Sequence, residues 1–151
     1  MQNKLKKIIL PVDNANDLDN KFLSALIDLQ KTLDINLLIE LFDKQLKKIV
    51  FHDYLNYKNL DEKININIGK VIQEKLTYNL QLNNENLGTL VVSKKDIFTE
   101  LEIKEIESLI SILCYPINNS LLFRQAIVDA SIDPITKLNN RMLFDKIIEQ
   151  E

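Results

Sequence analysis

The sequence predicts an α+β domain in which helices flank an antiparallel sheet on one face and a long helix follows the last strand. Three changes of pattern lead to this class. Apolar residues recur every three or four positions before residue 50, alternate with polar residues between about residues 51 and 94, and return to helical spacing after residue 99. Because the strands form one uninterrupted run, they are expected to pair in a single antiparallel sheet that carries the helices.

Two helices are expected before the sheet. The first would begin after Asn16, a residue type that caps helices, and continue to about Leu33. Its apolar face consists of Leu18, Phe22, Ala25, Leu26 and Leu29. Asp34 can cap the second helix, whose last turns carry several lysines that suit the negative end of the helix dipole. The apolar stripe of the second helix consists of Leu37, Leu38, Leu41, Phe42 and Leu46.

Four strands follow the two helices. The aromatic segment 51–58 predicts the first strand, and the strict alternation of isoleucine and asparagine in residues 64–68 predicts a second strand with one face on a core. Residues 76–82 alternate in the same way, and the polar loop 83–86 connects them to the fourth strand as a hairpin. Gly88 lies inside the fourth strand, which indicates a bulge or a close backbone approach.

A long helical pattern covers residues 100–130. Thr99 and Glu102 have the spacing of a capping box, so the start of this helix is well marked. Pro116 lies inside the pattern and predicts a kink or a break, because proline removes a hydrogen bond and clashes with the preceding turn. The apolar residues around and beyond it are expected to pack against a second copy of the chain as a parallel two-helix coil. The residues assigned to this homodimer contact are Leu113, Ile117, Leu121 and Ile127.

Composition excludes several classes of function. The net charge is −3, with acids and bases interspersed, so no basic patch predicts nucleic-acid binding. No apolar run reaches the roughly 18 residues of a membrane-spanning helix, and we expect a cytoplasmic protein. The single cysteine, Cys114, excludes an internal disulfide and any multi-cysteine metal site, and it is expected to be a buried apolar residue.

Few residues suggest a binding site. His52 is the only histidine, and a haem or metal ligand is a much weaker interpretation than a solvent-facing or structural side chain at a strand edge. Four aromatic residues could line a small ligand cavity, although the same pattern is typical of core packing. They are Phe51, Tyr54, Tyr57 and Tyr78. No catalytic residue, metal ligand or bound cofactor is predicted within these 151 residues.

The segment "LGTLVVSKKDIFTELEIKEIESLISIL" resembles the closing strand and final helix of GAF domains, a sensor fold of bacterial signalling proteins. The resemblance extends over residues 15–128 and leaves residues 1–14 as an N-terminal extension. It implies a GAF-like sheet and a C-terminal signalling helix. Ligand-binding GAF domains usually insert helices and loops between the middle strands, and here only about six residues separate the second and third strands. The usual pocket is therefore expected to be reduced.

The final residues are similar to the opening motif of GGDEF domains, the diguanylate cyclases, which typically reads Asp-x-Leu-Thr-Gly-Leu-x-Asn-Arg. The matching residues are Asp133, Thr136, Leu138, Asn140 and Arg141, whereas Lys137 replaces the usual glycine. Residues 129–138 would be the linker and opening motif, and 139–151 part of the first GGDEF helix.

This resemblance implies a parent protein that makes cyclic di-GMP from two GTP molecules with Mg²⁺. Asn140 would contact the guanine of GTP and Glu149 would assist it, but the Gly-Gly-(Asp/Glu)-Glu-Phe stretch needed for catalysis is absent from these residues. The chain is thus interpreted as a sensory and dimerisation module that is itself inactive. The alternatives are a receptor for an unknown small-molecule effector and a stand-alone interaction domain.

Overall fold

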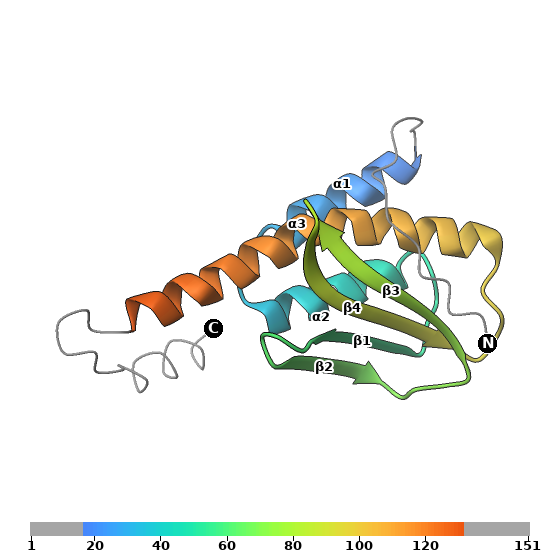
Figure 1. Cartoon of the computed structure of the whole chain (residues 1–151). Helices are drawn as coiled ribbons and strands as arrows, with labels where there is room; N and C mark the ends of the chain where they lie inside the picture. The colour runs from blue at the N-terminus through green and yellow to red at the C-terminus, as the bar shows by residue number, and fades with distance from the viewer. Residues whose placement is uncertain (1–16, 132–151) are drawn as a thin grey trace.

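The computed structural model describes residues 17–131 and confirms the α+β class, with three helices and a four-stranded antiparallel sheet (Figure 1). The predicted N-terminal extension 1–14 and the GGDEF-like motif lie outside the described residues. In chain order the elements are α1 (Asp17–Leu29), α2 (Ile35–Lys47), β1 (Tyr54–Asn59), β2 (Ile64–Gly69), β3 (Glu74–Leu82), β4 (Glu85–Lys94) and α3 (Glu100–Ala130).

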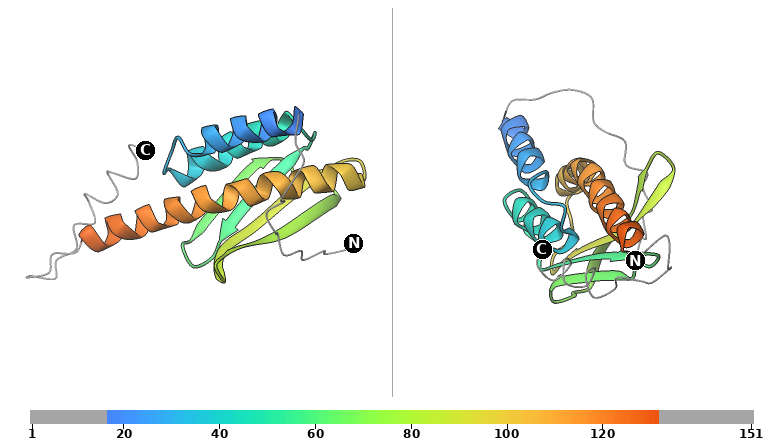
Figure 2. Two further views of the ribbon diagram at one scale, coloured as in Figure 1. Left: turned by 90° about the horizontal axis from the view of Figure 1, so that it is seen from above. Right: turned by 90° about the vertical axis from the view of Figure 1, so that its left-hand side faces the viewer.

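The sheet has the strand order β2-β1-β4-β3, and every neighbouring pair is antiparallel. The helices lie on one face of this sheet, as the sequence predicted, with α2 and α3 against the strands and α1 packed on both of them (Figure 2). Apolar side chains such as Leu55, Leu90 and Val92 point toward the helices and are fully buried. The opposite face of the sheet is polar, because side chains alternate between the two faces of a strand.

The boundaries of two elements differ from the prediction. The first helix ends at Leu29 rather than Leu33, because the next residues form the loop that leads to the cap of α2. The Asp34 carboxylate accepts a hydrogen bond from the Asn36 backbone nitrogen at 2.9 Å, so its capping role is confirmed. Strand β1 begins at Tyr54, three residues later than predicted, since Phe51 belongs to the connection from α2.

Helix α3 is continuous over 31 residues, so, of the predicted kink or break at Pro116, the break is wrong. An interior proline costs a helix about 3 kcal/mol, which tertiary packing must offset. Leu113 and Ile117 on either side of Pro116 are fully buried in the core. The Ser120 hydroxyl also donates a 2.7 Å hydrogen bond to the Leu33 carbonyl, which ties the next turn to the α1–α2 loop. These contacts hold the helix together across the proline.

The capping box at the start of α3 is confirmed. The Glu102 backbone nitrogen donates to the Thr99 hydroxyl at 3.2 Å, and the Thr99 backbone nitrogen donates to the Glu102 carboxylate at 2.8 Å. Gly88 also fulfils its prediction: it has a φ of 111°, it borders a shift in register between β3 and β4, and a side chain there would collide with the Lys58 carbonyl of β1.

Among the described residues, α3 is long and apolar enough to cross a membrane by length and composition, although composition alone had suggested no such segment. Half of its most apolar 18-residue stretch is buried inside this domain. Core helices meet the same criteria of length and composition.

Candidate functional site

The four aromatic residues do not surround a common cavity. Tyr57 and Tyr78 belong to the core, with 0% and 2% of their surface exposed. Phe51 is 69% exposed in the connection before β1, and Tyr54 lies on the polar face of the sheet, where its hydroxyl donates to the Asn67 side-chain oxygen at 2.7 Å. The core-packing interpretation is confirmed for Tyr57 and Tyr78. A shared cavity is not formed by the four residues, because strand alternation and the late start of β1 place their side chains in three different environments.

Tyr57 and Tyr78 differ in the partner of the hydroxyl. The Tyr57 hydroxyl donates a 2.6 Å hydrogen bond to the Leu87 carbonyl, and burial raises the pKa of Tyr57 to about 12. Burial also raises the pKa of Tyr78, and its hydroxyl has no hydrogen-bond partner among residues 17–131. The two phenols therefore remain protonated at neutral pH and contribute to packing rather than to acid–base chemistry.

His52 is a buried structural residue, so the solvent-facing interpretation is wrong. Its Nδ1 lies 3.1 Å from the Val50 carbonyl oxygen and its Nε2 lies 2.6 Å from a carboxylate oxygen of Asp43. Both of these oxygens accept hydrogen bonds only, so His52 makes both contacts when each ring nitrogen carries a proton. No ring nitrogen is free to bind a metal or a haem iron.

Asp43 is the centre of this buried cluster. Its second carboxylate oxygen lies 2.8 Å from the Lys47 ammonium, and the residue is only 5% exposed. Burial acts to raise the pKa of Asp43, but hydrogen bonds from His52 and Lys47 outweigh it and hold the pKa below its ordinary value of 3.8. The cluster joins the end of α2 to the start of the sheet. These contacts give Asp43 and His52 a structural role at this junction.

The remaining reactive groups in the described part of the chain also lack the surroundings of an active site. Cys114 is buried, and burial raises the pKa of its thiol to about 11, so the reactive thiolate is rare at neutral pH. No group of three or more histidine, cysteine or acidic side chains within residues 17–131 is arranged to hold a metal ion.

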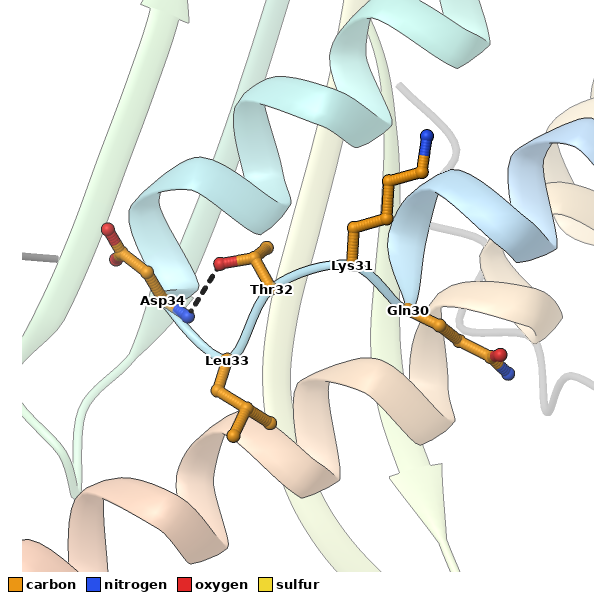
Figure 3. A pocket seen from close by; sticks show the side chains of 5 residues that line it. All are labelled: Gln30, Lys31, Thr32, Leu33 and Asp34. Atoms are coloured by element: carbon orange, nitrogen blue, oxygen red, sulfur yellow. Dashed lines mark hydrogen bonds between the residues drawn. The ribbon is translucent and has the colours of Figure 1, made fainter.

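Among the hollows formed by the described residues, two of the larger ones lie at the ends of elements. One of about 480 Å³ is lined by five consecutive residues of the α1–α2 loop, Gln30 to Asp34, and Figure 3 shows Leu33 of this loop extending beside the α3 ribbon. The other, of about 220 Å³, lies between the second half of α3 and the β1–β2 and β3–β4 turns. Its lining includes Asn59, Glu62 and Asn118. Neither hollow brings together a set of groups with a defined chemistry.

The structure changes the surface of α3 that is available for association. Leu113 and Ile117 are fully buried against the rest of the domain, so their assignment to a dimer contact is corrected. Leu121 and Ile127 are partly buried. The exposed apolar side chains of the helix include Tyr115 and Leu122, with 50% and 59% of their surface accessible.

Tyr115 and Leu122 belong to one exposed side of α3, and Leu122 also borders the hollow beside the β1–β2 and β3–β4 turns. They are seven positions apart, which places them two turns apart on the same side of the helix. Residues 112, 119 and 126 fall between and beside them at the three- and four-residue spacings of a coiled-coil seam. We define the outer face of α3 as the exposed residues Tyr115, Asn119, Leu122 and Ala126. Ile112 has the same spacing but packs partly against the core. Sequence reasoning missed this face, although the seven-residue spacing was visible, because α3 has apolar residues on both of its sides.

Asn140 and Glu149, which the resemblance assigned to GTP binding, lie outside the described residues. Comparison with protein-family models, with curated proteins and with solved structures finds no match to this chain. The resemblances to GAF and GGDEF domains therefore depend on the sequence motifs quoted above. The strongest candidate functional surface within the described domain is the outer face of α3.

Proposed function

We propose that this chain is a regulatory and dimerisation module with a GAF-like fold, and that two copies associate through the outer face of α3. The observation that carries the proposal is the half-exposed pair Tyr115 and Leu122 on a helix that continues beyond the sheet (Figure 1). Exposed apolar side chains on a helix are stabilised when they are buried against another protein surface.

The composition of the outer face favours a paired helix. Burying a large apolar side chain fully contributes about 1.5 to 3 kcal/mol, so the exposed halves of Tyr115 and Leu122 would contribute about 1 kcal/mol each per protomer. Asn119 stands between them at a seam position, where a polar residue is known to set register and the number of strands in a coil at some cost in stability. A parallel pair would bring the two Asn119 side chains together.

The direction of α3 suggests how the module would act. The helix leads from the sheet to the segment that resembles the opening motif of a GGDEF domain, beginning at Asp133. In the parent protein we propose, the paired helices hold two GGDEF domains face to face, so that a change in pairing or register would control cyclic di-GMP synthesis from GTP with Mg²⁺. The parent would be the enzyme, and this cytoplasmic module would regulate it.

Association is tested by light scattering on the complete chain at several concentrations. The wild type should be a dimer. Leu122→Glu should raise the Kd of the dimer at least about tenfold and so increase the fraction of monomer, because association would bury the new charge. Ile97→Glu is the matched control, since Ile97 is 77% exposed in the connection that precedes α3, far along the helix from Leu122. A monomeric wild type, or a Leu122→Glu variant that remains dimeric, would refute the proposed interface.

The proposed parent protein is tested separately by sequencing the source gene downstream of the codon for Glu151. A Gly-Gly-(Asp/Glu)-Glu-Phe stretch a few dozen residues downstream, together with conversion of GTP to cyclic di-GMP by the complete product, is the expected result. A stop codon there would remove the cyclase assignment and leave the dimerisation test unaffected.

A further inference from the structure

The face of the sheet opposite the helices carries an ordered array of polar side chains. The registers of the three strand pairs align one row across all four strands, formed by Asn65, Lys58, Thr89 and Asn79. A second row is formed by Asn67, Asn56, Val91 and Thr77. We call these two rows the polar sheet face. None of the helices in the described part of the chain covers it (Figure 2).

Hydrogen bonds fix the orientation of the amides on β1 and β2. The Asn56 side-chain nitrogen donates to the Ile66 backbone carbonyl at 3.0 Å, and a carbonyl can only accept, so the orientation of Asn56 is determined. The same nitrogen lies 2.7 Å from the Asn65 side-chain oxygen and 2.9 Å from that of Asn67. The oxygens of Asn65 and Asn67 therefore point inward at Asn56.

Because the side-chain oxygens of Asn65 and Asn67 point toward Asn56, their NH₂ groups, which are hydrogen-bond donors, point away from it. The Asn67 oxygen accepts from both Asn56 and the Tyr54 hydroxyl, which leaves the Asn67 NH₂ group without a partner among the described residues. The Asn65 NH₂ group is likewise unpaired within residues 17–131. The Lys58 ammonium adds a third donor beside Asn65 in the same row. The β1–β2 part of the face thus presents fixed donors and one positive charge to its surroundings.

The charge of the face differs from that of the whole chain. The complete sequence has 22 acidic and 19 basic residues and a net charge of −3. Neither row of the polar sheet face contains a carboxylate, and the only charged residue in the two rows is Lys58. A surface of outward donors with positive charge is complementary to a partner that presents acceptors with negative charge.

We propose that the polar sheet face binds an extended, carboxylate-bearing segment of a partner protein. The two rows are two residues apart along each strand, so they repeat at roughly 6.6 to 6.8 Å. Side chains on one side of an extended peptide repeat at the same roughly 6.6 to 6.8 Å interval. A peptide that runs parallel to β1 and β2 can therefore place one carboxylate against Asn65 and Lys58 and the next against Asn67. This surface shares no residue with the outer face of α3, and the proposal stands without dimerisation.

The test follows the side-chain NH₂ signals of asparagine by NMR in the complete chain. The probe is a capped peptide of alternating glutamate and threonine, with a glutamine–threonine peptide and a thymidine oligonucleotide as comparisons. The glutamate peptide should shift the Asn65 and Asn67 signals saturably below about 1 mM, and the shifts should weaken as salt is added. The glutamine peptide should bind at least about tenfold more weakly, because it lacks the negative charges.

Asn67→Asp is the decisive variant. Aspartate keeps the inward oxygen that accepts from Asn56 and Tyr54, but it replaces the outward donor with a negatively charged acceptor. The variant should fold normally and bind the glutamate peptide at least about tenfold more weakly. Asn36→Asp makes the same change at an exposed asparagine of α2 and should leave binding unchanged.

Four results would overturn the proposal. They are no saturable shift at Asn65 and Asn67, equal binding of the glutamine peptide, tighter binding of the oligonucleotide at the same residues, and equal weakening by Asn36→Asp and Asn67→Asp. The same peptides can be titrated into the Leu122→Glu variant, so peptide binding and dimerisation are measured independently and the two proposals can fail separately.

Discussion

Removing one hydroxyl from the core should have opposite effects at Tyr57 and Tyr78. Both side chains are almost fully buried, and phenylalanine preserves their shape. The Tyr57 hydroxyl donates at 2.6 Å to the Leu87 carbonyl, and Leu87 is the β4 residue left without a β3 partner where the register shifts. The next contact to this carbonyl is the Asn59 side chain at 3.4 Å, a long hydrogen bond. Tyr57→Phe therefore leaves a buried carbonyl poorly satisfied.

The magnitude follows from the cost of a buried group that loses its partner. Such a group costs about 1 to 3 kcal/mol, so Tyr57→Phe should lower the free energy of unfolding by about 1 to 2 kcal/mol after the weak Asn59 contact is allowed for. Tyr78→Phe removes a hydroxyl that has no partner among the described residues. It should leave the free energy unchanged or raise it by up to about 1 kcal/mol, because a desolvated polar group is lost.

Urea denaturation followed by far-ultraviolet circular dichroism measures both variants against the wild type. All three proteins must be compared at one concentration, because association adds to the stability of the folded state. The slope of the transition should not change, and the two variants should differ by about 2 kcal/mol, or roughly 4 to 8 °C in Tm for a chain of this size. If Tyr78→Phe loses as much stability as Tyr57→Phe, the two hydroxyls contribute equally to stability. The assignment of a hydrogen-bond partner to the Tyr57 hydroxyl alone would then be refuted.

Two further predictions concern the connections around β1. Asp43→Asn should destabilise the domain by about 2 kcal/mol at pH 7, because it removes the ion pair with Lys47 and weakens the hydrogen bond to His52. Since the folded pKa of Asp43 lies below 3.8, the stabilisation is present above that pH and is lost as the pH falls through the folded pKa, so the curves of variant and wild type should converge there. A constant difference from pH 7 to pH 2 would contradict this role. Gly69→Ala should cost at least about 1 to 3 kcal/mol in a thermal melt, because Gly69 has a φ of 84° and a side chain would collide with the Asp53 carbonyl. An unchanged Tm would exclude that collision.

Periodicity predicted the elements of the fold because each segment carries its own pattern. The isoleucine and asparagine alternation of residues 64–68 became β2, and Thr99 with Glu102 marked the first turn of α3 correctly. Phe51 was assigned to a strand because aromatic residues favour strands. In the structure the connection to β1 is held instead by His52, which pairs with Asp43, and by the Asp53 backbone nitrogen, which donates to the Ser93 carbonyl at 2.9 Å. These are tertiary contacts that local propensity does not contain.

The candidate surfaces could be predicted only in part. The alternation in β2 indicated that Asn65 and Asn67 face away from the core, but their alignment with Lys58 depends on the register with β1. For α3 the sequence showed two apolar sides and could not say which one packs on the sheet. The choice is made by the sheet and by the α1–α2 loop, which together bury Leu113 and Ile117 and leave Leu122 accessible.

The positions of the two surfaces lead to a specific question about regulation. Helix α3 contacts β3 and β4 from the face of the sheet opposite the polar sheet face, and the two surfaces share no residue. A peptide on the sheet and a second copy on the helix can therefore bind at the same time. If the peptide alters the dimer Kd by some factor, dimerisation must alter the peptide Kd by the same factor, because coupling of binding free energies is reciprocal. Equal peptide affinity for wild type and for Leu122→Glu would mean that the surfaces are independent, and the module would then act as a scaffold. A shared factor in both titrations would mean that α3 transmits a signal from the sheet to its outer face.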